Sequence, residues 1–239
     1  MTFNPESLNI KLFADGADID GMLEMNRKSY IKGFTTNPTL MRKAGVPNYR
    51  SFAKEVLSNI KTKPISFEVF SDNLNEMEHQ GLEIASWGDN VFVKIPITNT
   101  QGVTTFSVIE KLVAKDCKVN VTAVMTVKQV ETIISALNPK IPSYVSVFAG
   151  RIADTGRDPE KTIKASLQII NHLSKCEIIW ASPRELLNIF QAEAIGCNII
   201  TATSELLNKF SLVGKDLSLY SLETVKMFAN DAIKSEYVI

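Results

Sequence analysis

Short β-rich runs alternate with amphipathic helical stretches along almost the whole chain, and this alternation constrains the fold more than any other feature. Strands are expected near residues 8–14, 31–35, 65–70, 91–96, 118–122, 144–148, 177–181 and 198–202. Helices are expected near residues 18–29, 48–60, 74–86, 102–115, 127–137, 159–174 and 184–195, and after residue 203. Asp158-Pro159 and Ser182-Pro183 each place a capping residue before a proline, which is typical of a helix start.

Eight consecutive strand–helix units without a long linker indicate a single (β/α)8 TIM barrel, which is an α/β fold. A doubly wound sheet is the alternative. It rarely needs eight units, however, and no glycine-rich phosphate motif follows the first expected strand. The sequence therefore predicts the barrel.

The chain has 239 residues, which suits one large barrel as well as two small domains. No linker or low-complexity tract marks a boundary, so a single domain is expected over residues 1–239, with the barrel at about 8–208. A helical extension is expected at about 216–236, because residues 222–229 have an amphipathic pattern. This extension would cover either a neighbouring subunit or the mouth of the barrel.

The charge balance and the chain start make the cytoplasm the default location, and they do not exclude a small anionic substrate. Lysine plus arginine and aspartate plus glutamate number 26 each, so no basic surface indicates nucleic acid or an anionic membrane as partner. Residues 1–6 lack the basic and apolar regions of a signal peptide, and no apolar stretch is long enough to span a bilayer.

Cysteine and histidine usage predicts neither disulfides nor a metal site. Each of the three cysteines, Cys117, Cys176 and Cys197, opens an expected strand, so buried free thiols are expected. The two histidines, His79 and His172, fall in helical patterns without the converging ligands of a catalytic zinc site. We therefore expect no metal and no other cofactor.

Lys94 lies within an apolar run at residues 90–96 that is short enough to be one buried strand. Burial of an ammonium group without a counter-charge is costly, so such a lysine loses its proton readily and becomes a nucleophile towards carbonyls. A lone lysine at a strand end more often reaches into water. Lys94 is nevertheless expected at the C-terminal end of its strand, where a barrel carries its catalytic groups.

Other polar residues lie at matching strand ends. Asp15 ends the first expected strand, Glu68 lies in the third, and Asn120 and Thr122 share one face of the fifth. Asp15 could instead cap the following helix, and Thr122 could be an ordinary strand residue. Glu68 is harder to explain structurally, because glutamate is rarely buried unless it is paired. Together with Lys94 these residues predict one site.

Two arginines follow later strands and suggest a phosphorylated substrate. Arg151 follows the sixth expected strand and Arg184 the seventh. Either residue alone is more often a partner in a surface ion pair. Barrels often bind phosphate at these late loops, however, where arginine presents a planar fork of donors.

The motifs that carry a family resemblance are GFTTNPTL at 33–40, VKIP at 93–96, NVT at 120–122, YVS at 144–146 followed by Phe148, Gly150 and Arg151, and ASPR at 181–184. In this order and spacing the chain resembles the small transaldolases and their fructose-6-phosphate aldolase relatives. The resemblance covers about residues 8 to 202, and the combination of TTNP with VKIP is highly specific.

The resemblance implies a class I aldol transfer through a Schiff base on Lys94. Asp15 would then be the acid/base for the sugar hydroxyl, and Glu68 and Thr122 would position a water that carries protons to and from the imine. The residues implied in substrate binding are Thr36, Asn37, Asn120, Ser146, Phe148, Arg151, Ser182 and Arg184. Among these, Asn37 and Asn120 would hold hydroxyls of the dihydroxyacetone unit. Ser146 and the two arginines would hold the phosphate, with Ser182 nearby.

Two positions separate transferase from simple aldolase within this family. The transaldolase branch is similar to this chain in having Glu68 and Phe148, where the aldolase branch has glutamine and tyrosine. The resemblance therefore implies transfer of a dihydroxyacetone unit between sugar phosphates, as in the pentose phosphate pathway, by a homo-oligomer such as a decamer. Release of free dihydroxyacetone is the alternative, and a barrel that binds a sugar phosphate without turnover is a third reading.

Some residues depart from the family pattern. Gly16 replaces a usual threonine, Val147 a usual proline and Pro183 a usual aromatic residue, and TATS at 201–204 stands where a Pro-Pro pair is common. These departures motivate the non-catalytic reading, and they leave the identity of the donor and acceptor sugars open.

Overall fold

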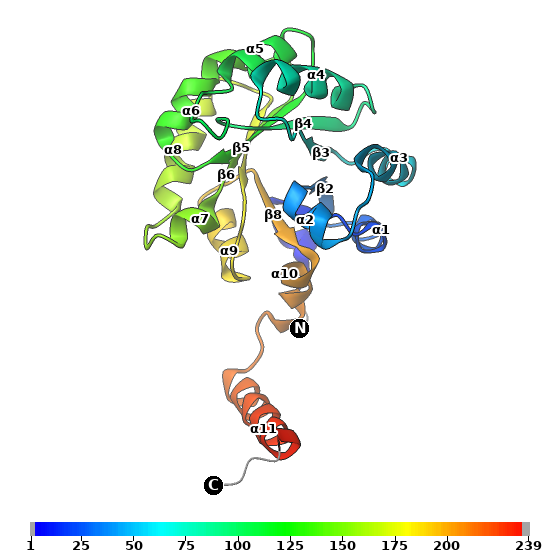
Figure 1. Cartoon of the computed structure of the whole chain (residues 1–239). Helices are drawn as coiled ribbons and strands as arrows, with labels where there is room; N and C mark the ends of the chain where they lie inside the picture. Colours follow the sequence, from blue (N-terminus) through cyan, green and yellow to red (C-terminus); the bar gives the residue numbers. More distant parts are fainter. Residues whose placement is uncertain (1–2, 236–239) are drawn as a thin grey trace.

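The computed structural model describes residues 3–235 and contains a closed barrel of eight parallel strands in chain order (Figure 1). The strands are β1 (Lys11–Asp15), β2 (Ile31–Thr35), β3 (Ile65–Glu68), β4 (Val91–Pro96), β5 (Val119–Val124), β6 (Ser143–Val147), β7 (Cys176–Trp180) and β8 (Ile199–Thr203). Strand β8 pairs with β1 and closes the barrel. The predicted (β/α)8 fold is confirmed.

Each strand is followed by at least one helix, and the helices surround the barrel (Figure 1). The eight helices expected from the sequence are α1 (Ile19–Asn26), α3 (Tyr49–Asn59), α4 (Leu74–Ala85), α5 (Phe106–Val113), α6 (Val127–Ile133), α8 (Glu160–Ile170), α9 (Leu187–Ala194) and α10 (Ser204–Asn208). Short 3-10 turns lie at Pro5–Ser7, Ile134–Ala136 and Lys209–Leu212.

Two short helices were not expected from the sequence. Helix α2 (Pro38–Lys43) follows β2, and α7 (Ala149–Ala153) follows β6. Both are too short to show a helical period. Helix α2 has a local signal nevertheless, because the side chain of Asn37 accepts a hydrogen bond from the N–H of Leu40 and Pro38 occupies the first turn.

The two expected helix starts at proline have different outcomes. Asp158 accepts a hydrogen bond from the N–H of Glu160, where α8 begins. The start predicted at Ser182-Pro183 is wrong, because α9 begins only at Leu187. Ser182 has a φ of 61°, a left-handed conformation that no helix start uses, and it turns the chain after β7.

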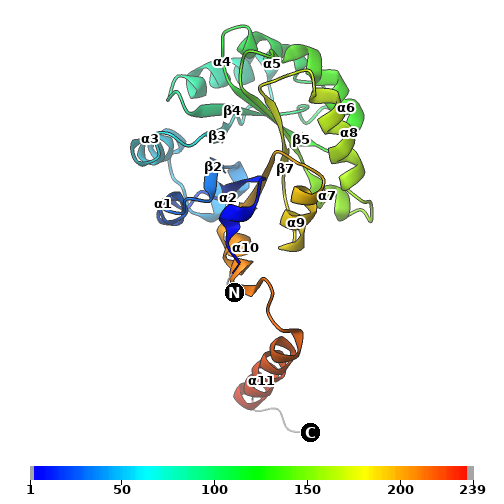
Figure 2. The ribbon, with the colours of Figure 1, turned by 180° about the vertical axis from the view of Figure 1, so that it is seen from behind.

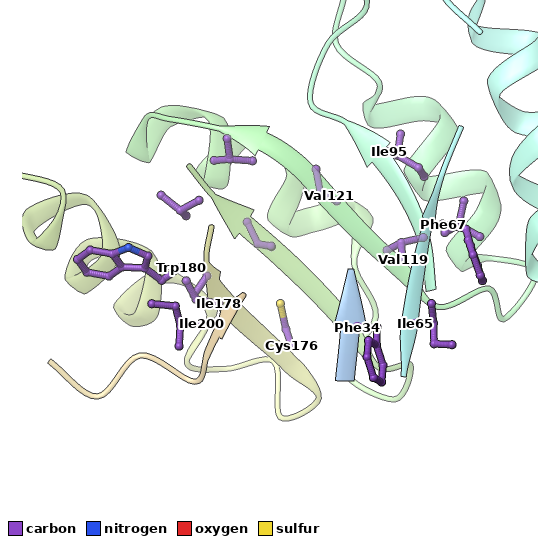
Figure 3. Close-up of a cluster of buried hydrophobic side chains, with 14 of the residues drawn as sticks. Phe34, Ile65, Phe67, Ile95, Val119, Val121, Cys176, Ile178, Trp180 and Ile200 are labelled. Carbon is purple, nitrogen blue, oxygen red and sulfur yellow. The ribbon is translucent and has the colours of Figure 1, made fainter. Parts of the chain in front are cut away.

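Two apolar layers stabilise the barrel. The outer layer joins the strands to the helices; part of it is drawn in Figure 3, where Phe34, Phe67 and Trp180 come from three different strands. The three cysteines are buried. The inner layer contains the strand residues Phe13, Phe92, Tyr144, Ile179 and Ile199 together with Ala181, which directly follows β7. The rings of Phe92 and Tyr144 stack at 4.1 Å between centroids.

The C-terminal helix α11 (Leu217–Ser235) projects away from the barrel beyond α10 (Figures 1 and 2). The predicted extension ended at about residue 236, which lies outside the described residues. None of the residues of α11 is buried, although it carries large apolar side chains such as Leu222, Val225 and Phe228. Within residues 3–235, no helix is both long enough and apolar enough to cross a membrane.

Candidate active site

Lys94 lies on the inner face of β4 with only 5% of its surface exposed, and among residues 3–235 it is the one charged residue classed as buried. Its Nζ atom donates a hydrogen bond of 2.9 Å to the main-chain oxygen of Thr36 and lies 3.1 Å from Oε2 of Glu68. Glu68 is the neighbour of Lys94 in the β3–β4 register, so the ladder itself places the pair side by side. The buried ammonium group of Lys94 therefore has a counter-charge in Glu68.

Asp15 ends β1 close to this pair. The hydroxyl of Thr35 donates a hydrogen bond of 2.7 Å to Oδ1 of Asp15, and it lies 2.6 Å from the hydroxyl of Thr201. Burial raises the pKa of Asp15, while the positive charge of Lys94 and the hydrogen bond from Thr35 act in the opposite direction. Asp15 therefore holds a proton more readily than an exposed aspartate does.

A chain of buried hydrogen bonds crosses the inner face beside Lys94. The hydroxyl of Ser146 donates to Oδ1 of Asn120 at 2.8 Å, and Nδ2 of Asn120 donates to the hydroxyl of Ser66 at 2.9 Å. Asn120 is the register neighbour of Lys94 on β5. Because an amide in this chain cannot rotate without breaking two hydrogen bonds, Asn120 presents its second N–H in a fixed direction.

Thr122 lies two residues beyond Asn120 on the same strand, and its side chain is buried. Its hydroxyl has no hydrogen-bond partner in the part of the chain that the structure describes. A buried hydroxyl without a partner is costly, so this group is suited to bind a substrate atom or a water. Ala123, the next residue, has a φ of 59°, and the β5–β6 register shifts there.

The two arginines lie on the exposed rim. Arg184 forms an ion pair with Asp154, in which its Nε atom donates to Oδ1 at 3.0 Å. The hydrogen bond from Arg184 lowers the pKa of Asp154, and the charge of Arg151 acts in the same direction. Arg151 and Arg184 thus lie near the same carboxylate. Ser146, expected with them, is buried beside Asn120 instead.

The loops that carry the arginines touch each other. A Cβ atom added to Gly150 would lie 1.6 Å from the main-chain oxygen of Ser182, so only glycine fits at this position. Phe148, two residues earlier, is partly buried against the inner apolar layer. The segments after β6 and β7 therefore form one continuous part of the rim.

The two TTNP residues expected to bind substrate have structural contacts of their own. Thr36 donates its hydroxyl to the main-chain oxygen of Ser66 and offers its own main-chain oxygen to Lys94. Asn37 caps α2 through Oδ1, so its amide nitrogen takes no part in the cap.

Sequence reasoning missed Thr35, Thr201 and Ser66. Each is a buried hydroxyl residue at an inward-facing strand position, two residues from another polar or inward residue. Hydroxyl residues are common in strands, so no sequence signal distinguishes these three from ordinary strand residues. No group of three or more His, Cys, Asp or Glu side chains able to hold a metal ion is found among residues 3–235.

The sequence model of one protein family, described as Transaldolase/Fructose-6-phosphate aldolase, matches residues 12–237. A probable transaldolase of Sulfurihydrogenibium sp. (strain YO3AOP1) is 36% identical over 196 residues, which cover 80% of this chain and 84% of the relative. A probable transaldolase of Dehalococcoides mccartyi is 31% identical over 199 residues (83% and 88% of the two chains). One of Thermoanaerobacter sp. (strain X514) is 34% identical over 199 residues, with the same coverage.

Proposed function

The chain belongs to the transaldolase and fructose-6-phosphate aldolase family, and from this premise we propose that it transfers a dihydroxyacetone unit between sugar phosphates through a Schiff base on Lys94. The observation that carries the proposal is the buried amine of Lys94, 3.1 Å from the carboxylate of Glu68. A buried amine next to a proton acceptor is the arrangement that attack on a carbonyl carbon requires.

The proposed reaction uses Lys94, Glu68 and Thr122 first. The amine of Lys94 attacks the ketose C2 carbonyl and forms a carbinolamine, which loses water to give the protonated imine. Glu68 accepts a proton from the attacking amine, and Glu68 and Thr122 hold the water that carries protons to and from the carbinolamine oxygen. The unpartnered hydroxyl of Thr122 supports this role.

Asp15 serves the carbon–carbon bond cleavage. As the C3–C4 bond breaks, Asp15 takes the proton of the C4 hydroxyl, the aldehyde forms, and the bonding electrons move into the protonated imine to give an enamine on Lys94. The raised pKa of Asp15 makes its carboxylate a better proton acceptor than an ordinary aspartate. In the reverse direction the same proton returns to the oxygen of the acceptor aldehyde.

The proposed substrate contacts fall into two groups, one near Lys94 and one at the rim. Thr36, Asn37 and Asn120 hold the hydroxyls of the dihydroxyacetone unit near Lys94. Ser146, which donates a hydrogen bond to Asn120, holds the phosphate together with Arg151 and Arg184, and Ser182 lies nearby in the chain. Arginine and a phosphate anion can form paired hydrogen bonds.

Phe148 and Glu68 favour transfer over simple cleavage. The ring of Phe148 contributes no hydroxyl, so it cannot help to protonate the enamine. The three-carbon unit then stays on Lys94 until an aldehyde acceptor arrives. A cavity of about 430 Å³ beside Asp15 is lined in part by Gly16, Thr203 and Ser204.

The test is reductive trapping on the intact protein. Treatment with fructose 6-phosphate and borohydride should attach the sugar-derived unit to Lys94, and Lys94→Met should abolish the mass increase. Lys11→Met is the matched control, because Lys11 is half-exposed and paired with Glu177 at the opposite end of the barrel. An unchanged mass of the folded wild-type protein would refute the Schiff-base mechanism.

A second assay separates transferase from aldolase. Fructose 6-phosphate should be consumed slowly alone and rapidly when erythrose 4-phosphate is added. Equal rates with and without the acceptor would assign the aldolase reaction instead. Substrate binding without trapping would identify a sugar-phosphate-binding barrel.

Homo-oligomer formation, of which a decamer is one form, is part of the same proposal. Helix α11 exposes 63% of Phe228 and 58% of Val225, and an isolated helix gains little stability from its own hydrogen bonds. Contact with further copies of the chain would cover these side chains. Light scattering of the full chain should give a multiple of its monomer mass, and Val225→Glu together with Phe228→Glu should lower it. A monomeric wild-type protein would contradict this part.

A further inference from the structure

The end of β3 lacks one hydrogen-bond partner on its β2 side. The N–H of Thr36 donates to the main-chain oxygen of Ser66 at 3.1 Å, and the next step of the same ladder would join residue 38 to Glu68. Residue 38 is Pro38, which has no N–H. The main-chain oxygen of Glu68 therefore receives no donor from the strand beside it.

The hydroxyl of Tyr49 takes this place. Tyr49 is the first residue of α3, and its hydroxyl donates a hydrogen bond of 2.9 Å to the main-chain oxygen of Glu68. The ring packs edge-on against Phe67 and Trp87, with centroids 6.2 and 5.5 Å away. These ring contacts hold the side chain of Tyr49 in place independently of its hydrogen bond.

Few strand contacts hold the main chain of Glu68 in place. It is the last residue of β3, which has only four residues, and only two β2–β3 residue pairs are in register. The pKa of Tyr49 is raised by burial and by the negative charge of Glu68, so the hydroxyl keeps its proton and remains a donor over the working pH range.

We propose that Tyr49 is a positioning residue for the reaction. Because β2 ends at Thr35 and Pro38 already begins α2, the hydroxyl of Tyr49 supplies the donor that the β2 side no longer offers, fixes the end of β3 and thereby keeps the carboxylate of Glu68 against the amine of Lys94. This inference rests on the proposed function, because it assigns Tyr49 a role only if Glu68 assists Schiff-base formation on Lys94.

The experiment removes the hydroxyl and keeps the ring. In Tyr49→Phe we expect kcat for transfer, and the rate of borohydride trapping, to fall about fivefold, as loss of one hydrogen bond predicts, while KM for fructose 6-phosphate stays within about twofold. Tyr30→Phe is the matched control. Tyr30 packs on Phe210, and its hydroxyl makes no hydrogen bond within residues 3–235, so both constants should stay at wild-type values.

A double-mutant cycle shows whether the effect passes through Glu68. In the Glu68→Gln background, Tyr49→Phe should cause little further loss, because the carboxylate that Tyr49 positions is already absent. An equal fall in both backgrounds, or a rise of KM with kcat unchanged, would overturn the proposal. Failure of the proposed function is distinguishable, because then the wild-type protein itself would not be trapped.

Discussion

Replacing Gly150 by alanine tests whether the contact between the loops after β6 and β7 positions the arginines. The added Cβ would lie 1.6 Å from the main-chain oxygen of Ser182 and 3.3 Å from Nε of Arg184, whereas ordinary contact begins near 3.4 Å. The two loops must therefore separate by the difference, about 1.8 Å, because a main-chain oxygen cannot rotate away. The substitution changes packing and phosphate geometry together.

Both consequences have expected sizes. Overpacking of a tight contact lowers the free energy of unfolding by about 1–3 kcal/mol, which urea denaturation measures. A displacement of about 1 Å in a binding group lowers activity by up to about a hundredfold. We expect most of this loss in Gly150→Ala as a higher KM for fructose 6-phosphate, because Lys94 and Glu68 lie on other strands.

The control is Gly156→Ala in the loop that follows α7. Gly156 has a φ of 75° and no neighbour within 4 Å of an added Cβ, so alanine there costs about 1–2 kcal/mol in backbone strain without moving the rim. Its KM should stay at the wild-type value. If folded Gly150→Ala also keeps the wild-type KM, the contact does not position the arginines and the reasoning is refuted.

Three further predictions address other parts of the site. Folding raises the pKa of Asp15 above its ordinary value of 3.8. The protonated carboxyl therefore stabilises the folded state at pH below 3.8, and this stabilisation is lost as the pH rises through the raised pKa of the folded protein. Asp15→Asn should therefore be inactive but more stable than wild type at neutral pH, with no difference in acid below that window. Thermal unfolding as a function of pH checks this, and equal stability at neutral pH would contradict it. Asp154→Asn should free Arg184 from its ion pair and lower KM for the phosphorylated substrate, in steady-state assays at low salt, whereas a higher KM would assign Asp154 to holding Arg184 in place. Gly33→Ala should reduce stability by about 1–3 kcal/mol in urea denaturation, because its Cβ would meet the ring of Phe13 at 2.5 Å, and unchanged stability would mean that the ring moves freely.

The barrel could be predicted because its strands are short, buried and separated by clear helical periods. The expected ranges 31–35 and 91–96 coincide with β2 and β4, because most residues of both strands are buried and polar segments bound them. The start of α9 could not be predicted. The conformation of Ser182 depends on the approach of Gly150, which is distant in sequence.

A residue of the site could be predicted from the sequence only where its polarity differs from that of the residues around it. Lys94 and Glu68 are charged residues within apolar strands, and that contrast indicated them before the ladder placed them side by side. Thr35 and Ser66 gave no such contrast, because hydroxyl residues are common in strands. Tyr49 gave none either, because its bond to Glu68 joins a helix to a strand 19 residues away.

The turn from β2 into α2 shows why a sequence motif can outlast the reaction it accompanies. Gly33 makes room for an aromatic ring, Thr36 bonds to the neighbouring strand, Asn37 caps a helix and Pro38 begins it. Each of these contacts stabilises the fold whether or not Lys94 reacts. Selection for folding alone would therefore retain GFTTNP in a descendant that had lost turnover. In such a descendant only changes at Lys94, Glu68 or Thr122 would show that turnover had been lost, because the arrangement of these three residues has no comparable structural use.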